Sequence, residues 1–136
     1  MKKKSAWEFY GVKIIKQIIV SGEPEPNLLD EFYENNAKQT FEESILLIRA
    51  QSFDQAYKIA AKKAREGEQP YQNKYGQQVI WKFIEAVDCF AILDELVSGA
   101  EIYSCFHTAN EGELVEDFLD KWFHCIDDGC RKARYQ

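Results

Sequence analysis

The chain has 136 residues, of which 46% are hydrophobic and 14% aromatic, so it is long enough to bury one core and too apolar to be disordered. Its 17 basic and 23 acidic side chains give a formal net charge of −6 at pH 7. A protein held to nucleic acid by phosphate contacts needs a basic surface, so this charge disfavours nucleic acid as a partner. We expect a single domain over residues 1–136.

Two strands are expected in the first fifty residues. Residues 7–20 are rich in β-branched and aromatic side chains and contain no proline, which is typical of a long strand. Two prolines in residues 21–27 end that strand. Residues 28–37 are expected to form a loop with one helical turn. A second strand is expected from Thr40 to Ala50, with apolar side chains on both of its faces.

The clearest expected element is a helix from Ser52 to Glu66. Its apolar side chains, four of them alanines, recur at the spacing of one helical face. Ser52 is suited to cap the N-terminus, and Gln55 stands where a capping box places its second residue. Gly67 is suited to the C-terminal end. Because alanine is small, this face can approach a sheet closely.

Two further strands and a second helix complete the expected pattern. We expect a turn at residues 71–77, strands at 78–90 and 101–108, and a helix capped by Asn110. One face of the third strand is expected to carry Val79, Trp81, Phe83, Val87 and Cys89. The order β-β-α-β-β-α favours a two-layer α+β fold, in which two amphipathic helices cover a mainly antiparallel four-stranded sheet.

Four short motifs follow one another along the chain at residues 41–48 (FEESILLI), 71–76 (YQNKYG), 79–83 (VIWKF) and 101–104 (EIYS). In order and spacing they resemble a family of small, mostly bacterial domains that is described only as a domain of unknown function. With the opening strand, the resemblance extends over about residues 7–108, and the C-terminal helix and basic tail at 110–136 lie beyond it. It implies a fold unit, and no reaction, cofactor or partner.

No residue pattern indicates a metal, a cofactor or a catalytic nucleophile. The residue types that bind zinc are spaced without a Cys-x-x-Cys pair: His107, His124, Cys125 and Cys130. Two pairs are candidates for a nucleophilic thiol with a histidine partner, Cys105 with His107 and Cys125 with His124. Cys105 and His107 would share one face of a strand and could touch, but no third residue is identifiable that would orient either pair. Phosphate-binding glycine loops are absent as well. We therefore expect no metal, no cofactor and no enzymatic activity.

Glu42 and Glu43 begin the second strand, where neighbouring side chains point to opposite faces of the sheet. They are therefore not expected to act as a pair of catalytic carboxylates. Cross-strand ion pairs with Lys13 or Lys82 are the expected alternative.

Acidic side chains gather around the proline-containing segment, at Glu23, Glu25, Asp30, Glu31 and Glu34. We interpret them as an exposed surface that steers a basic protein. The sequence thus predicts a non-enzymatic protein-binding module, and an immunity-type inhibitor of a basic toxin fits its size and charge. The alternative is a small enzyme or ligand-binding protein whose site lies between sheet and helices and uses Glu42, Tyr103 or His107.

The expected location is the cytoplasm. No segment approaches the roughly 20 consecutive apolar residues of a membrane span, so no membrane contact is expected. Charged residues interrupt the apolar stretch that a leader peptide would need near Met1. A chain of this length has no need of disulfide bonds, so its four cysteines are expected to be reduced.

Overall fold

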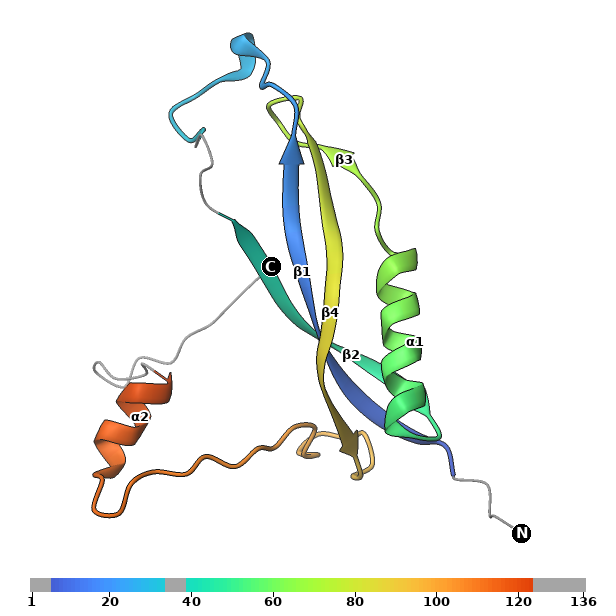
Figure 1. The fold of residues 1–136 in the computed structure, drawn as a ribbon, viewed down its shortest axis with the longest axis vertical. Helices are drawn as coiled ribbons and strands as arrows, with labels where there is room; N and C mark the ends of the chain where they lie inside the picture. The colour runs from blue at the N-terminus through green and yellow to red at the C-terminus, as the bar shows by residue number, and fades with distance from the viewer. Residues whose placement is uncertain (1–5, 34–38, 124–136) are drawn as a thin grey trace. The chain divides into compact units, whose positions relative to one another are not determined.

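The computed structural model describes residues 6–33 and 39–123. The chain divides into two compact units, residues 1–103 and 104–136. The first unit holds a four-stranded antiparallel sheet and one α-helix, and the described part of the second holds a short α-helix. The predicted α+β class is therefore confirmed, and the elements can be followed by their labels in Figure 1.

The sheet is organised around β1 (Glu8–Ser21), which has a long antiparallel partner on each side. β2 (Thr40–Ala50) pairs along one side in an unbroken register. β4 (Gln78–Ile92) pairs along the other side, and the two-residue β3 (Tyr71–Gln72) adds to the start of β4. The resulting strand order is β2-β1-β4-β3. The three long strands lie where the sequence predicts them.

β4 differs from β2 because its register with β1 shifts twice opposite residues 13–16. Ile84 and Val87 are the extra residues at these two β-bulges. One extra residue reverses the alternation of side chains, so Val87 is 49% exposed although Phe83 is buried at 8%. The prediction that these two residues share a face is wrong for this reason. After the second bulge the odd-numbered residues of β4 point toward α1 again, and Cys89 packs against the core as predicted.

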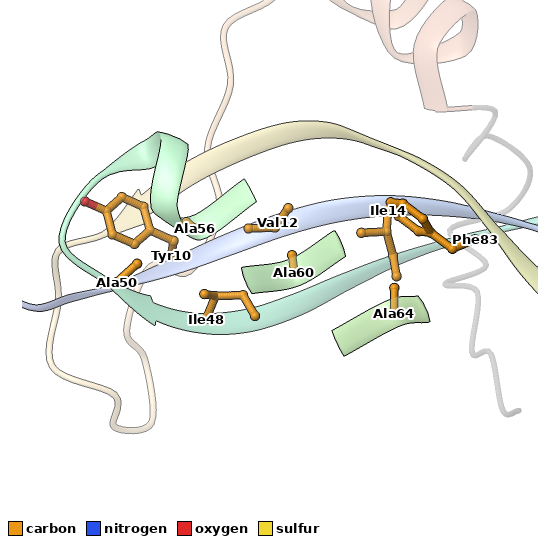
Figure 2. Packing of buried hydrophobic residues seen from close by; sticks show 9 residues of the cluster. All are labelled: Tyr10, Val12, Ile14, Ile48, Ala50, Ala56, Ala60, Ala64 and Phe83. Atoms are coloured by element: carbon orange, nitrogen blue, oxygen red, sulfur yellow. The ribbon is translucent and has the colours of Figure 1, made fainter. Parts of the chain in front are cut away.

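The helix α1 (Phe53–Glu66) packs against β1, β2 and β4. Its stripe of buried alanines lies over branched and aromatic side chains of these strands, as Figure 2 shows. The core residues are Tyr10, Val12, Ile14, Ile48, Ala50, Ala56, Ala60, Ala64 and Phe83. Because an alanine extends no further than its Cβ, the helix approaches the sheet closely, as predicted.

The N-terminus of α1 is capped as the sequence predicts. The Ser52 Oγ accepts a hydrogen bond from the backbone N–H of Gln55 at 3.1 Å. The Gln55 side chain in turn accepts one from the backbone N–H of Gln51 at 2.5 Å. The reciprocal pair satisfies two backbone donors where the helix begins.

The strand predicted at residues 101–108 is wrong. These residues form no strand, and the fourth strand of the sheet is β3, which lies in the segment predicted to be only a turn. The backbone N–H of Glu101 bonds to the Asp94 carboxylate at 3.0 Å instead of a neighbouring strand. Side chains with high β-propensity fit a pleated surface, but they do not supply the partner strand that such a surface needs.

The second helix, α2 (Val115–Phe123), begins five residues later than Asn110. The Asn110 carbonyl accepts a hydrogen bond from the backbone N–H of Glu113 at 3.0 Å, and Gly112 has a φ of 83°. A residue in that conformation cannot continue a right-handed helix, so the chain turns first and the predicted cap at Asn110 is wrong. Among the described residues, no helix has the length and apolar character that crossing a membrane requires.

Candidate functional site

The side of the sheet opposite α1, which we call the helix-free face, carries large apolar side chains that solvent reaches. Along β2 the odd-numbered residues point to this face and are exposed, whereas the even-numbered residues point to α1. Ile45 and Leu47 are 49% and 54% exposed, and Phe9 on β1 is also exposed. An apolar area of this kind on a folded domain usually marks an interaction site.

A pocket with a volume of about 290 Å³ lies on the helix-free face. Its walls come from all three long strands and from the segment that follows β4. The lining residues are Gly11, Ile45, Leu46, Leu47, Phe90, Ile92, Leu96, Ile102 and Tyr103. All of these side chains are apolar except for the Tyr103 hydroxyl, so the pocket is suited to an apolar group.

Gly11 makes room for one wall of the pocket. It lies directly opposite Phe90 in the pairing of β1 with β4, and a Cβ at this position would overlap the Phe90 ring. The Phe90 ring packs edge-on against Tyr103, with 5.0 Å between ring centroids. The glycine therefore lets an aromatic pair lie against the strand, and this pair forms part of the wall.

Lys13 and Glu43 form an ion pair on the same face, with 3.0 Å between Nζ and Oε1. This confirms the predicted cross-strand pairing of Glu43. The Lys13 ammonium also lies 5.5 Å from the centroid of the Tyr103 ring, which lines the pocket. The hydrogen bond to the Glu43 carboxylate raises the pKa of Lys13, so this bond stabilises the charged form of the lysine.

Acidic side chains flank the pocket. Glu43 lies on β2 and Asp88 on β4, and three more acids neighbour lining residues in the segment after β4. These three are Asp94, Glu95 and Glu101, and all of them are exposed. Because these five acids outnumber Lys13 and Arg49, the basic residues of this face beside the pocket, the surroundings of the pocket carry a net negative charge.

The acidic loop singled out from the sequence lies elsewhere. Glu23, Glu25, Asp30 and Glu31 are exposed, and Glu34 lies outside the described residues. The loop follows the end of β1, whereas Gly11 lies ten residues earlier on that strand, a separation of about 30 Å along an extended chain. The loop acids and the pocket are therefore separate surfaces.

Asp30 differs from its neighbours because its carboxylate is held by three donors. The Lys74 ammonium and the Tyr75 hydroxyl each donate to it at 2.7 Å, and the backbone N–H of Phe32 donates at 3.0 Å. The Lys74 hydrogen bond, followed by that from Tyr75, lowers the pKa of Asp30. Asp30 thus ties the loop to the turn before β4, which is a structural role that its sequence position does not reveal.

That turn contains the YQNKYG motif. The Asn73 Oδ1 accepts backbone hydrogen bonds from Tyr75 and Gln77, each at 3.0 Å, and Gly76 has a φ of 81°. The Tyr75 carbonyl also accepts the backbone N–H of Glu25 at 2.9 Å. The motif therefore builds a tight turn and anchors the acidic loop on it.

Of the three residues named for a small-molecule site, Tyr103 and Glu42 lie on opposite sides of the sheet. Tyr103 lines the pocket, but Glu42 points to the opposite side of the sheet. His107 belongs to the second unit, where its Nε2 lies 3.4 Å from the Cys105 Sγ and its ring packs among Phe118, Trp122 and Phe123. The predicted contact between Cys105 and His107 is thus confirmed, although the segment is not a strand.

Metal ligands are not clustered in the part of the chain that the structure describes. No group of three or more His, Cys, Asp or Glu side chains there is placed to hold an ion. Three of the zinc-binding residue types considered above lie outside the described residues, namely His124, Cys125 and Cys130.

The chain matches a known family model over most of its length. The family model described as Domain of unknown function (DUF4288) matches residues 9–104. No curated protein and no solved structure matches the chain. The matched segment contains the sheet from the second residue of β1 onward, α1 and every residue that lines the pocket, whereas α2 lies beyond it.

Proposed function

This chain belongs to the family described as Domain of unknown function (DUF4288), a description that assigns no activity, and we propose from its geometry that it is a non-enzymatic protein-binding module. The observation that supports this function is the apolar pocket on the helix-free face, surrounded by exposed Ile45, Leu47 and Phe9. Apolar surface of this kind, bordered by charged side chains, is typical of a site that another protein covers.

The size of the pocket favours one side chain of a partner. Pockets for drug-sized molecules have volumes of about 300–1,000 Å³, and the volume here, about 290 Å³, falls at the lower limit. Interfaces gain most of their binding free energy from a few anchors that fill such pockets. We therefore propose that an aromatic or leucine side chain of the partner enters beside Gly11 and Phe90.

The charge around the pocket selects a basic partner. Asp88 and the acids after β4 lie beside the anchor position, whereas Glu43 is already paired with Lys13. Lysine or arginine next to the anchor would then face carboxylates, which speeds association and suppresses acidic competitors. A basic toxin inhibited by an immunity-type protein has this charge, and so does any other basic protein with an exposed apolar anchor.

The acidic loop is a second proposed contact, which acts through charge alone. Replacing Glu23, Glu25 and Glu31 by Gln is expected to change the free energy of unfolding by less than about 1 kcal/mol, as surface changes usually do. It should slow association with a basic partner at low salt. Asp30 stays unchanged in this variant because its carboxylate ties the loop to Lys74 and Tyr75.

The pocket can be tested with a displayed library of random peptides that is selected on the wild type alone, after which the affinity of each enriched peptide is measured for the wild type and for the Leu47→Glu variant. We expect the enriched peptides to carry an aromatic residue or leucine next to lysine or arginine. Their affinity should fall at least about tenfold for Leu47→Glu, which places a charge at the pocket wall. The matched control is Leu114→Glu, because Leu114 is 65% exposed and belongs neither to the pocket lining nor to the acidic loop.

Two results would contradict the proposal. In the first, the enriched peptides bind Leu47→Glu as tightly as the wild type. In the second, no peptide is enriched, but small phenols or indoles bind and shift the NMR signals of residues around Tyr103. That outcome would favour the alternative, a small-ligand-binding protein, since Tyr103 contributes the one polar side-chain group of the pocket lining.

A further inference from the structure

The two edges of the sheet are protected to different degrees. The β4 edge is interrupted by two bulges, its start is covered by β3, and the backbone N–H of Phe83 donates to the Glu68 carboxylate at 2.8 Å. Bulges and covering segments of this kind are how proteins prevent a sheet edge from pairing with another chain. The outer edge of β4 is therefore poorly suited to accept a further strand.

The β2 edge has none of these features. Its 11 residues pair with β1 without a register shift, contain no proline or lysine, and have no partner strand on their outer side among the described residues. A long, regular and partly apolar edge is ready to accept a strand in the plane of the sheet.

We propose that the outer edge of β2 pairs with β2 of a second copy of this chain, antiparallel and across a two-fold axis perpendicular to the sheet. In such a pair, residues directly opposite each other point to the same face. The odd-numbered residues of one copy must then lie opposite odd-numbered residues of the other. Only registers in which the two residue numbers sum to an even number satisfy this condition.

Charge complementarity selects one of these registers. When Leu46 lies opposite Leu46 of the second copy, Glu43 lies opposite Arg49 and Ile45 lies opposite Leu47. A shift of two residues in one direction places Arg49 opposite Phe41, and a shift in the other direction places it opposite Ile45. In both shifted registers neither Glu43 nor Arg49 lies opposite a residue of the other charge. The register with Leu46 opposite Leu46 is therefore the one that pairs them, and it does so twice per dimer.

The same register agrees with the contacts already present on the helix-free face. Lys13 lies 3.0 Å from Oε1 of Glu43, and the other carboxylate oxygen can accept a hydrogen bond from Arg49 of the second copy. The half-exposed side chains of Ile45 and Leu47 gain an apolar neighbour across the two-fold axis. Because pairing occurs in the plane of the sheet, it joins two helix-free faces into one continuous surface and covers neither pocket.

The test is the molar mass of the intact protein in solution, measured by sedimentation equilibrium up to the millimolar range. We expect the wild type to approach twice the 15.9 kDa mass of one chain. Arg49→Glu and Glu43→Arg should each weaken the dimer at least about tenfold, because like charges then face each other twice. The control is Lys82→Glu, which changes the net charge as Arg49→Glu does but lies on β4.

Mixing the two single variants gives the decisive measurement. In a mixed dimer of Arg49→Glu with Glu43→Arg, one charge pair is the native pair and the other is the same pair reversed. An equimolar mixture should therefore dimerise although neither variant does so alone. A wild type that stays monomeric, single variants that remain dimers, or a mixture that remains monomeric would each overturn the proposal.

Hydrogen exchange of the wild type keeps the proposal testable if a variant does not fold. Amide protons of residues 41–49 should exchange more slowly at concentrations where the dimer forms than after dilution. Exchange in this segment that is independent of concentration would overturn the pairing, whatever the variants do.

Discussion

The two faces of the sheet are built from alternate residues of the same strands, yet one face is buried under α1 and the other is exposed to solvent. Ile48 is 2% exposed beneath α1, whereas its neighbour Leu47 is 54% exposed on the helix-free face. Both are aliphatic residues of similar size on one regular strand. Apolar character on both faces of a strand therefore does not by itself mean that the strand is buried on both faces.

The largest expected effect is the difference between these two neighbours. Ile48→Ala should lower the free energy of unfolding by about 2–5 kcal/mol, since it removes buried side-chain volume and leaves a cavity under α1. Leu47→Ala should lower it by less than about 1 kcal/mol, because its side chain is largely solvated already. Denaturant titration of both variants checks the comparison, and equal losses would show that the helix-free face is covered in solution.

A smaller effect is expected from Gly11→Ala. The new Cβ would overlap the Phe90 ring, so the ring must move, and overpacking of this kind costs about 1–3 kcal/mol. The Phe90→Ala background should remove most of that cost, since the overlapping ring is then absent. A double-mutant cycle by denaturant titration measures this coupling, and a cycle without coupling would show that Gly11 is not needed for the aromatic wall.

The smallest expected effect concerns the ion pair on the helix-free face. Glu43→Gln should cost about 0.2–1 kcal/mol at pH 7, as is usual for a pair that solvent reaches. The folded-state pKa of Lys13 is raised above 10.5, so its contribution is full below that pH and is lost as the pH rises through the higher folded value. The difference in stability between wild type and Glu43→Gln should therefore shrink above about pH 10.5. Thermal unfolding at pH 7 to 11 checks this, and a difference that grows with pH would contradict it.

The sequence predicted correctly those elements that neighbouring residues in the chain determine by themselves. The three long strands, the alanine stripe of α1 and the cap at Ser52 depend on side-chain alternation, helical spacing and one hydrogen bond. The strand at 101–108 failed because a strand needs a neighbour far away in the chain. The Asn110 cap failed because Gly112, two residues on, turns the backbone first.

The candidate site was harder to predict because its parts come from distant segments. Gly11, Leu47 and Phe90 meet only through the pairing of three strands, and the bulges in β4 set which of its residues face the pocket. The one available signal was the apolar character of both faces of β2. The acidic loop was visible as a charge cluster, but the internal role of Asp30 depends on Lys74 and Tyr75, more than forty residues away.

The two bulges of β4 have a consequence for how this family can vary in length. Ile84 and Val87 each add one residue relative to β1, and the pairing of β4 with β1 resumes directly after each of them. Deleting either residue alone would remove its bulge and leave the other pairs in place, because each residue of β4 points to the same face as the β1 residue opposite it, and Phe90 would still lie opposite Gly11. Family members are therefore expected to differ in length by single residues at these two positions, with no change in which residues of β4 face the core and which face the pocket.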